Sequence, residues 1–360
     1  MRRFRFLDLL KTYAVIMMIQ GHTLDAVLNP QAKQTGLYQF MYILRGLTAP
    51  AFLIASGCGL AFSICRKRNL KWHEIFKQRI LRIFPILIAG YFLHLPRFSL
   101  YQLLTQTSKE EIIQFFQCDI LQTIGWTILV LQIILIFVKD KRIIIPGAII
   151  SVLMIVHFTP TINNSSKSPN FFTQLLTPKF GSNFPLFPFS SYLIFGLLFG
   201  FIFHEFNEQI SIKRMNLLIL FSGIIFFGFS FLTKIEDFNL FYLRTGLLVM
   251  LITLFLIFEF KKSKILDFFG AIGQESFLIY FVHIMIVYGS VLNVKNNFAH
   301  YFGATLNTAS SVILAISLIL LMVAMGYLWH YFKIQKPLVS KILRNCLIGF
   351  ILVRSLTSLN

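Results

Sequence analysis

A succession of long apolar segments is the feature that most constrains how this chain of 360 residues can fold. The segments lie near residues 7–29, 37–64, 78–96, 117–138, 143–162, 188–205, 215–233, 241–260, 268–292 and 306–332, with a weaker one at 342–356. A helix of about 20 mostly apolar residues is long enough to cross the hydrocarbon core of a bilayer. The pattern therefore predicts an all-α, polytopic transmembrane helical bundle of ten or eleven spans, with residues 1–360 forming one integral-membrane domain.

The composition favours a membrane protein over a soluble one. Hydrophobic residues make up 56% of the chain and charged residues only 13%, whereas about 25% of residues are charged in a typical soluble domain. A net charge of +19 would suggest a nucleic-acid partner in a soluble protein, but here the basic residues form short runs between apolar segments. We therefore expect contact with membrane lipids and no nucleic acid. The four cysteines lack metal-ligand spacing, so we expect neither a disulfide nor a metal site.

Basic residues gather in alternate connections, and this pattern orients the chain in the membrane. They lie within residues 2–5, 66–77, 139–142, 213–214, 261–264 and 333–344. Since cytoplasmic connections carry an excess of Lys and Arg, the pattern predicts a cytoplasmic N-terminus. The longest outer connection, Ile162–Phe187, is rich in Asn, Ser and Pro and is predicted to form a lid or rim. No small-residue cleavage site follows the first apolar segment, so we expect that segment to be retained.

The first segment, Leu7–Asn29, carries an unusual stripe of polar side chains: Asp8, Lys11, His22 and Asp25. At 100° per residue, these four positions fall within an arc of roughly 100° on one helix face. Ionisable groups in the hydrocarbon layer cost a few kcal/mol each, so they usually face the bundle interior and mark a pathway or a reaction site. The stripe therefore indicates that a pathway or a reaction site lies along this helix.

Within this stripe, Lys11 and His22 lie about three turns apart, or roughly 16 Å along the helix axis. The predicted orientation places Lys11 near the cytoplasm and His22 in the outer half. A neutral imidazole there could accept a proton from a hydroxyl or amine, as a general base working near neutral pH. Asp25, one turn further on, could hold the tautomer of His22 or stabilise its imidazolium. The structural alternative is a histidine that only hydrogen-bonds to a neighbouring helix.

Two arginines near the cytoplasmic end of the third segment, Arg79 and Arg82, are one helical turn apart and precede Pro85. Two guanidinium groups in this arrangement could bind a polyphosphate through charge-assisted hydrogen bonds. The alternative is that both are interfacial anchors that contact lipid headgroups.

Other polar residues lie in the outer halves of later segments. Arg45 precedes a run of small residues, Ala55–Gly59, which permits close helix packing or the approach of a ligand chain, and we expect packing. Asp119 and Gln122 lie one turn apart and could either bind a polar acceptor or pair with Arg45.

His283 follows a glycine-containing helix start, Gly270–Gly273, and is a second histidine within an apolar segment. A hydrogen bond to another helix is its structural interpretation, and substrate binding is its functional one. The sequence contains no P-loop, no dinucleotide fingerprint, no zinc-binding histidine pair and no serine-nucleophile elbow. Hydrolysis by a metal or a catalytic triad is therefore unsupported.

Taken together, these stretches resemble the multi-span acyl-CoA-dependent acyltransferases, namely the acyltransferase-3 family and the related heparan-alpha-glucosaminide N-acetyltransferase-like bacterial membrane proteins. The resemblance rests on Phe6–Lys11 followed by His22, on Arg79 and Arg82, and on Gly270–His283. Three further stretches look more like the second branch: Ala49–Gly57, Asp119–Gly125 and Phe184–Phe189. They occur in the expected order over most of the chain.

The resemblance implies that His22 is the essential histidine of the first helix and that Arg79 and Arg82 serve the acyl-CoA side. One position departs from the family pattern, since Lys11 stands where an arginine is usual, which keeps the charge but loses the planar fork. The resemblance also implies acyl-CoA as a co-substrate, no permanently bound cofactor, and a location in the bacterial inner membrane.

Our hypothesis from sequence is an acyltransferase that moves an acyl group, most simply acetyl, from cytoplasmic acyl-CoA to a glycan or glycolipid acceptor at the outer face. His22 is the predicted general base, with Asp25 or Asp8 as its electrostatic support. Lys11, Arg79 and Arg82 are the predicted donor-side cations. Arg45, Asp119, Gln122 and His283 are the predicted acceptor-binding residues.

Two alternatives come from other classes. A transporter or flippase for a glycan-lipid intermediate would also carry intramembrane charges, although the internal repeat expected of it is not visible in the sequence. A structural or sensory membrane protein would use the polar stripe only to join helices.

Overall fold

The computed structural model describes residues 4–66, 72–138, 140–206, 209–232 and 236–357. Over these residues the fold consists of helices, together with one isolated bridge between Leu28 and Leu306, and no strand is present in the described ranges. This confirms the all-α expectation. Part of the second basic connection, residues 67–71, lies outside the described residues.

Among the described residues, seven helices are long and apolar enough to cross a membrane, and an eighth span results if the bent pair Lys264–Gln274 and Ser276–Val287 counts as one. These account for eight of the predicted spans. The remaining predicted spans are those near residues 7–29, 78–96 and 342–356. The first of these helices carries the polar stripe, which lowers its hydropathy. The second has only a short apolar part, Ile80–Leu93, and the third is the basic last helix. A multi-pass membrane protein is confirmed, whereas its orientation stays a prediction.

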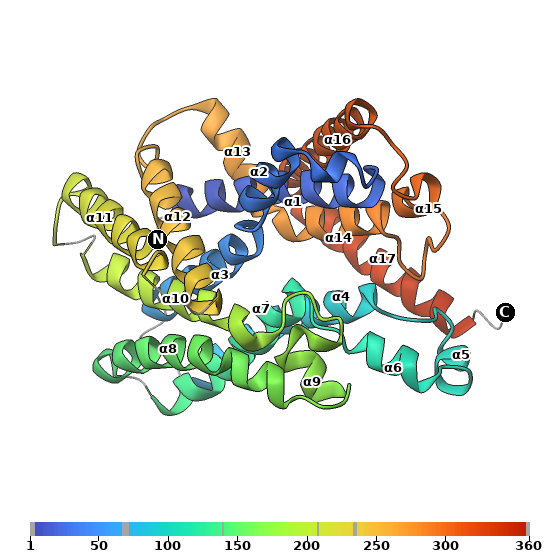
Figure 1. Cartoon of the computed structure of the whole chain (residues 1–360), viewed down its shortest axis with the longest axis horizontal. Helices are drawn as coiled ribbons and strands as arrows, with labels where there is room; N and C mark the ends of the chain where they lie inside the picture. The colour runs from blue at the N-terminus through green and yellow to red at the C-terminus, as the bar shows by residue number, and fades with distance from the viewer. Residues whose placement is uncertain (1–3, 67–71, 139, 207–208, 233–235, 358–360) are drawn as a thin grey trace. The chain divides into compact units, whose positions relative to one another are not determined.

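The chain folds as two compact units. The first contains Met1–Leu10, Ala49–Phe92 and Phe116–Lys261. Its helices are α3 (Thr48–Arg66), α4 (Trp72–Leu93), α7 (Ile120–Phe137), α8 (Lys141–Ser165), α9 (Phe171–Leu176), η2 (Pro178–Phe180), α10 (Leu186–Phe206), α11 (Ile212–Ser230) and α12 (Glu236–Leu256). Helices α11 and α12 run side by side, and α10 packs against α8 (Figure 1).

Helices α3 and α10 approach each other so closely that glycine is required on both. A Cβ atom on Gly57 would lie 2.6 Å from the backbone nitrogen of Leu197, and one on Gly196 would lie 2.7 Å from the Cα of Ile54. Gly200, four residues after Gly196, faces Ala61 in the same way. This small-residue contact lets the two backbones meet, as is common between membrane helices, and it confirms the packing predicted for the small-residue run of α3.

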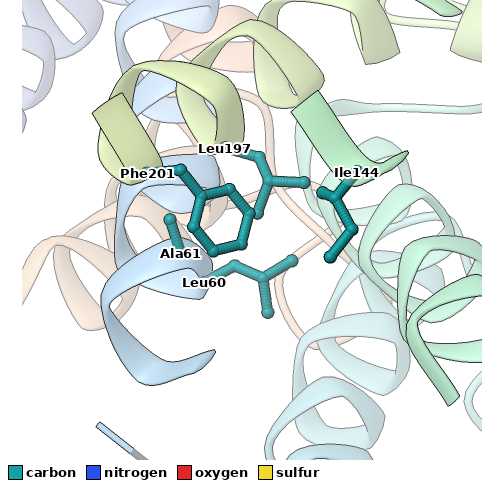
Figure 2. Packing of buried hydrophobic residues seen from close by; sticks show 5 residues of the cluster. All are labelled: Leu60, Ala61, Ile144, Leu197 and Phe201. Atoms are coloured by element: carbon teal, nitrogen blue, oxygen red, sulfur yellow. The ribbon is translucent and has the colours of Figure 1, made fainter. Parts of the chain in front are cut away.

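A hydrophobic cluster continues this contact (Figure 2). It consists of Leu60, Ala61, Ile144, Leu197 and Phe201, contributed by α3, α8 and α10. Because membrane helices gain little from the hydrophobic effect once inserted, such interdigitation is their main source of association energy. The cluster therefore fixes α8 onto the α3–α10 pair.

The first helix, α1 (Arg5–Val27), begins in the first unit and continues in the second. At its start, the backbone N–H of Phe6 donates to the buried carboxylate of Glu259 at 2.9 Å, and the Arg5 guanidinium donates to the carbonyls of Phe258 and Lys261. The carboxylate satisfies one of the free N–H groups of the helix N-terminus. These contacts fix the first turn of α1 against the segment that follows α12.

The second unit contains Lys11–Thr48, Leu93–Phe115 and Lys262–Asn360. Besides most of α1, its helices are η1 (Ala32–Gln34), α2 (Gly36–Arg45), α5 (Leu100–Thr105), α6 (Lys109–Phe115), α13 (Lys264–Gln274), α14 (Ser276–Val287), α15 (Phe298–Phe302), α16 (Thr308–Gln335) and α17 (Pro337–Thr357). Helices α13 and α14 both pack on α16. The end of α1 is held by backbone hydrogen bonds from Ala304 to Ala26 and from Leu306 to Val27, at 3.1 and 2.9 Å.

An ionic cluster holds the break between α13 and α14, where the two axes are bent by 64°. Glu275 occupies the break, and its buried carboxylate contacts Nδ1 of His330 at 3.0 Å and the ammonium of Lys333. Both partners come from α16. The cluster therefore anchors the start of α14, the helix that carries His283 about two turns further on.

We expect replacement of Gly57 by Ala to destabilise the protein, because the added methyl group would collide with the backbone of α10. Overpacking of this kind costs about 1–3 kcal/mol. A Cβ atom added to Gly59 on the same helix would meet no atom within 4 Å, so Gly59→Ala is the matched control. Thermal unfolding in detergent measures both, and equal midpoints for the two variants would contradict the packing described here.

We expect Glu275→Ala to lower thermal stability as well, because His330 and Lys333 would lose their shared acceptor. A hydrogen bond to a charged group is worth about 1.5–3 kcal/mol, and Lys333 is 46% exposed, so the loss should lie at the lower end. Lys336→Ala, at an exposed position just beyond this cluster, is the control and should leave the midpoint unchanged. A Glu275→Ala protein as stable as wild type would show that the cluster does not hold the break.

Candidate functional site

Two histidines from distant parts of the sequence meet in the second unit. His22 Nδ1 lies 3.1 Å from His283 Nε2, so the two imidazoles share a hydrogen bond between α1 and α14. Their rings are nearly parallel, with an interplanar angle of 13° and centroids 5.3 Å apart. The structure therefore brings the predicted base and a predicted acceptor-binding histidine into direct contact.

The two rings differ in burial and in their further contacts. His283 is fully buried, and its Nδ1 lies 2.9 Å from the carbonyl oxygen of Ile279, one turn earlier in α14. His22 is half-buried, and Tyr288 packs edge-on against its ring and donates a hydrogen bond to its backbone carbonyl at 3.3 Å. The inner imidazole is thus fixed by its own helix, and the outer one is accessible in part.

Asp25, one turn beyond His22, belongs to a separate cluster on α1 and α2. Its Oδ1 accepts a hydrogen bond from Arg45 Nη1 at 2.9 Å and another from the Tyr38 hydroxyl. The ammonium of Lys33 donates to the Asp25 backbone carbonyl at 2.8 Å. The Asp25 side chain is 41% exposed, whereas the Arg45 side chain is only 9% exposed.

The Arg45 guanidinium is enclosed by aromatic rings and by the backbone of α1. It lies 5.0 Å from the ring centroids of both Tyr38 and Tyr42, within cation–π range. It also donates to the Gly21 carbonyl at 3.1 Å, and a Cβ atom on Gly21 would lie 2.6 Å from Arg45 Cδ. A glycine immediately before His22 is therefore what lets the arginine lie flat against α1.

The predicted donor-side residues occupy the other end of α1 and helix α4. Asp8 is buried in the first turns of α1, and Lys11, one turn later, is half-buried. Arg82 is exposed on α4. Arg79 lies on the same helix, but its side chain is outside the described part of the structure.

Asp119 and Gln122 belong to the first unit, at the start of α7. The Gln122 side chain accepts from the backbone N–H of Asp119 at 3.3 Å, and Asp119 Oδ1 accepts from the Asn183 side chain at 2.9 Å. Gln122 is fully buried. This is a helix-capping arrangement, whereas the partner of Arg45 is Asp25.

Several residues of the histidine pair and of the Asp25–Arg45 cluster were not predicted from the sequence. Tyr38 and Tyr42 precede Arg45 by seven and three residues, so helical spacing alone would have placed all three on one face. Tyr288 lies five residues after His283, just past the end of α14. No comparable local signal marks Gly21, because its role depends on a side chain from another helix.

Chemically, the site offers a partly accessible imidazole and, one turn away, an exposed carboxylate with an arginine and two tyrosines. A neutral imidazole can accept a proton, and the neighbouring groups can bind hydroxyl or amine functions by hydrogen bonds and ring stacking. The arrangement is therefore suited to activating a nucleophile brought to the site.

Comparison with known families identifies the chain. The acyltransferase-3 family model, described as an acyltransferase domain, matches residues 4–328, which include His22 and His283. A comparison with curated proteins found no match. Because the family match covers nearly the whole chain and the fold contains several membrane-spanning helices, this protein belongs to the acyltransferase-3 family and is a multi-pass membrane acyltransferase.

Proposed function

We propose that this protein transfers an acyl group, most simply acetyl, from cytoplasmic acyl-CoA to a hydroxyl or amine of a glycan or glycolipid acceptor at the outer face, with His22 as general base. The observation that carries the proposal is the half-buried imidazole of His22, on the first helix of an acyltransferase-3 domain, held by the buried imidazole of His283 on α14. Since the chain crosses the membrane several times, its residues can lie at both membrane faces.

In the proposed reaction, the acceptor oxygen or nitrogen attacks the thioester carbonyl of acyl-CoA. The bond from that atom to the acyl carbon forms, and the carbon–sulfur bond breaks. The imidazole of His22 takes the proton of the acceptor and then returns it to the departing CoA thiolate. The products are the acylated acceptor and CoA, so no oxidant, reductant or net proton is required.

On the acceptor side, Asp25 and Arg45 support binding of a polyhydroxyl compound. The side chain of Asp25 is 41% exposed, and its carboxylate can accept hydrogen bonds from hydroxyl groups. The Tyr42 ring is exposed on the same cluster and offers a flat apolar surface to the C–H face of a sugar ring. These side chains lie within about one helical turn of His22 along α1, or on the helix packed against it.

On the donor side, we assign Lys11, Arg79 and Arg82 to the phosphates of CoA. Arg82 is exposed on α4, where a guanidinium can form bidentate hydrogen bonds to phosphate. At the corresponding family position, Lys11 can act only as a point charge. We therefore expect the arginines to contribute more to CoA affinity than Lys11.

We expect His22→Ala to lower the rate of acyl transfer about 10²–10⁴-fold, the usual contribution of a general base, while the protein still inserts and folds. The measurement is transfer of label from radioactive acetyl-CoA to membrane glycan in vesicles. His300→Ala, on α15, is the control for loss of a histidine elsewhere. Wild-type transfer by the His22→Ala protein would refute the assignment.

We expect CoA to raise the unfolding temperature of the wild-type protein through ligand linkage, and we expect the rise to disappear in the double variant Arg79→Ala/Arg82→Ala. Arg214→Ala, at an exposed position of α11, removes one arginine elsewhere and should keep the rise. A protein stabilised by a glycolipid but never by CoA would instead favour the transporter alternative.

A further inference from the structure

We propose that His283 is a positioning residue that holds His22 in the tautomer protonated on Nδ1, so that the basic lone pair lies on His22 Nε2. This inference rests on the proposed function, because it names the residue that prepares the general base. It replaces the acceptor-binding role suggested for His283 by the sequence, and it gives to a second histidine the tautomer-holding role suggested for Asp25.

His283 carries its proton on Nδ1. Its Nδ1 lies 2.9 Å from the carbonyl oxygen of Ile279, and a carbonyl oxygen can only accept a hydrogen bond. Nδ1 of His283 therefore carries the N–H. A neutral imidazole has one N–H, and a fully buried ring is far less costly to hold neutral than charged. The remaining nitrogen, Nε2, is thus an acceptor.

The position of the proton on His283 determines which nitrogen of His22 is protonated. His22 Nδ1 lies 3.1 Å from the acceptor nitrogen of His283, and a hydrogen bond between two nitrogens requires one N–H. Since the proton of His283 is engaged with Ile279, His22 must supply it. In its neutral form His22 then carries its proton on Nδ1 and its lone pair on Nε2.

The basic nitrogen of His22 also has a defined orientation. The N–H of Nδ1 and the lone pair of Nε2 point outward from the ring in widely divergent directions, so Nε2 of His22 is directed away from His283. The hydrogen bond to His283, across which the two rings are nearly parallel at 13°, and the edge contact of Tyr288 with the His22 ring restrict rotation of the imidazole. His22 is thereby fixed both in tautomer and in direction before any substrate arrives.

This arrangement differs from a catalytic triad in its electrostatics. A buried carboxylate would orient the imidazole and also stabilise the imidazolium, whereas a neutral histidine orients it without adding negative charge. Without His283, the His22 ring would sample both tautomers, of which only one has a lone pair on Nε2. Loss of the residue that orients a metal-bound histidine typically costs about 10–100-fold, and we expect a loss of similar size for His22.

The activity test compares two amides at position 283. His283→Gln can place its terminal oxygen near the former Nε2 position and accept from His22, whereas the shorter His283→Asn can reach the Ile279 carbonyl but not His22. We expect kcat to fall about 10–100-fold in His283→Asn, with the KM for acetyl-CoA changed less than about twofold, and to recover in His283→Gln. Equal kcat values for Asn and Gln, or a wild-type kcat for Asn, would overturn the proposal.

A spectroscopic test is independent of activity and of whether these variants fold. In wild-type protein labelled with ¹⁵N-histidine, the His22 signals, identified by their loss in His22→Gln among those of 8 histidines, should show Nδ1 protonated and Nε2 unprotonated. Protonation of His22 on Nε2 would overturn the inference. If His22→Ala retains full transfer but the Nδ1–H tautomer is found, the proposed function has failed and the positioning of His22 stands.

Discussion

The hydrogen bond between His22 and His283 is the interaction on which the functional interpretation depends. In a bilayer, polar side chains cannot rely on water and must find partners within the protein. Here the half-buried ring of α1 is paired with a fully buried ring of α14 at 3.1 Å. The position of that second ring in turn depends on the Glu275 cluster, which anchors the start of α14 onto α16.

The same rule explains the other polar contacts of the second unit. Arg45 lies buried between two tyrosine rings and reaches the exposed carboxylate of Asp25, and Gly21 gives its side chain room to cross α1. Arg45 and Asp25 are each paired, while the Asp25 side chain remains partly exposed. The charged pair can therefore stabilise the helix pair and still present a carboxylate beside the proposed base.

Much of this arrangement follows from the sequence, but the pairing of residues does not. Periodicity located the apolar helices and the polar stripe of α1, and the small residues of α3 predicted its close contact with α10. By contrast, the partner of His22 is 261 positions away, and the carboxylate that receives the Phe6 N–H is 253 positions away. Helical spacing defines which residues share a face, whereas it carries no information about which other helix that face meets.

The most direct test of the account is acyl transfer by the purified protein in sealed liposomes that carry a glycolipid acceptor and receive acetyl-CoA, labelled in the acetyl group, on one side only. We predict that labelled acetyl groups appear on the acceptor in amounts that depend on acetyl-CoA and on the protein. Movement of unmodified glycolipid across the bilayer, with no label on it, would contradict the assignment of this chain as an acyltransferase that uses acyl-CoA.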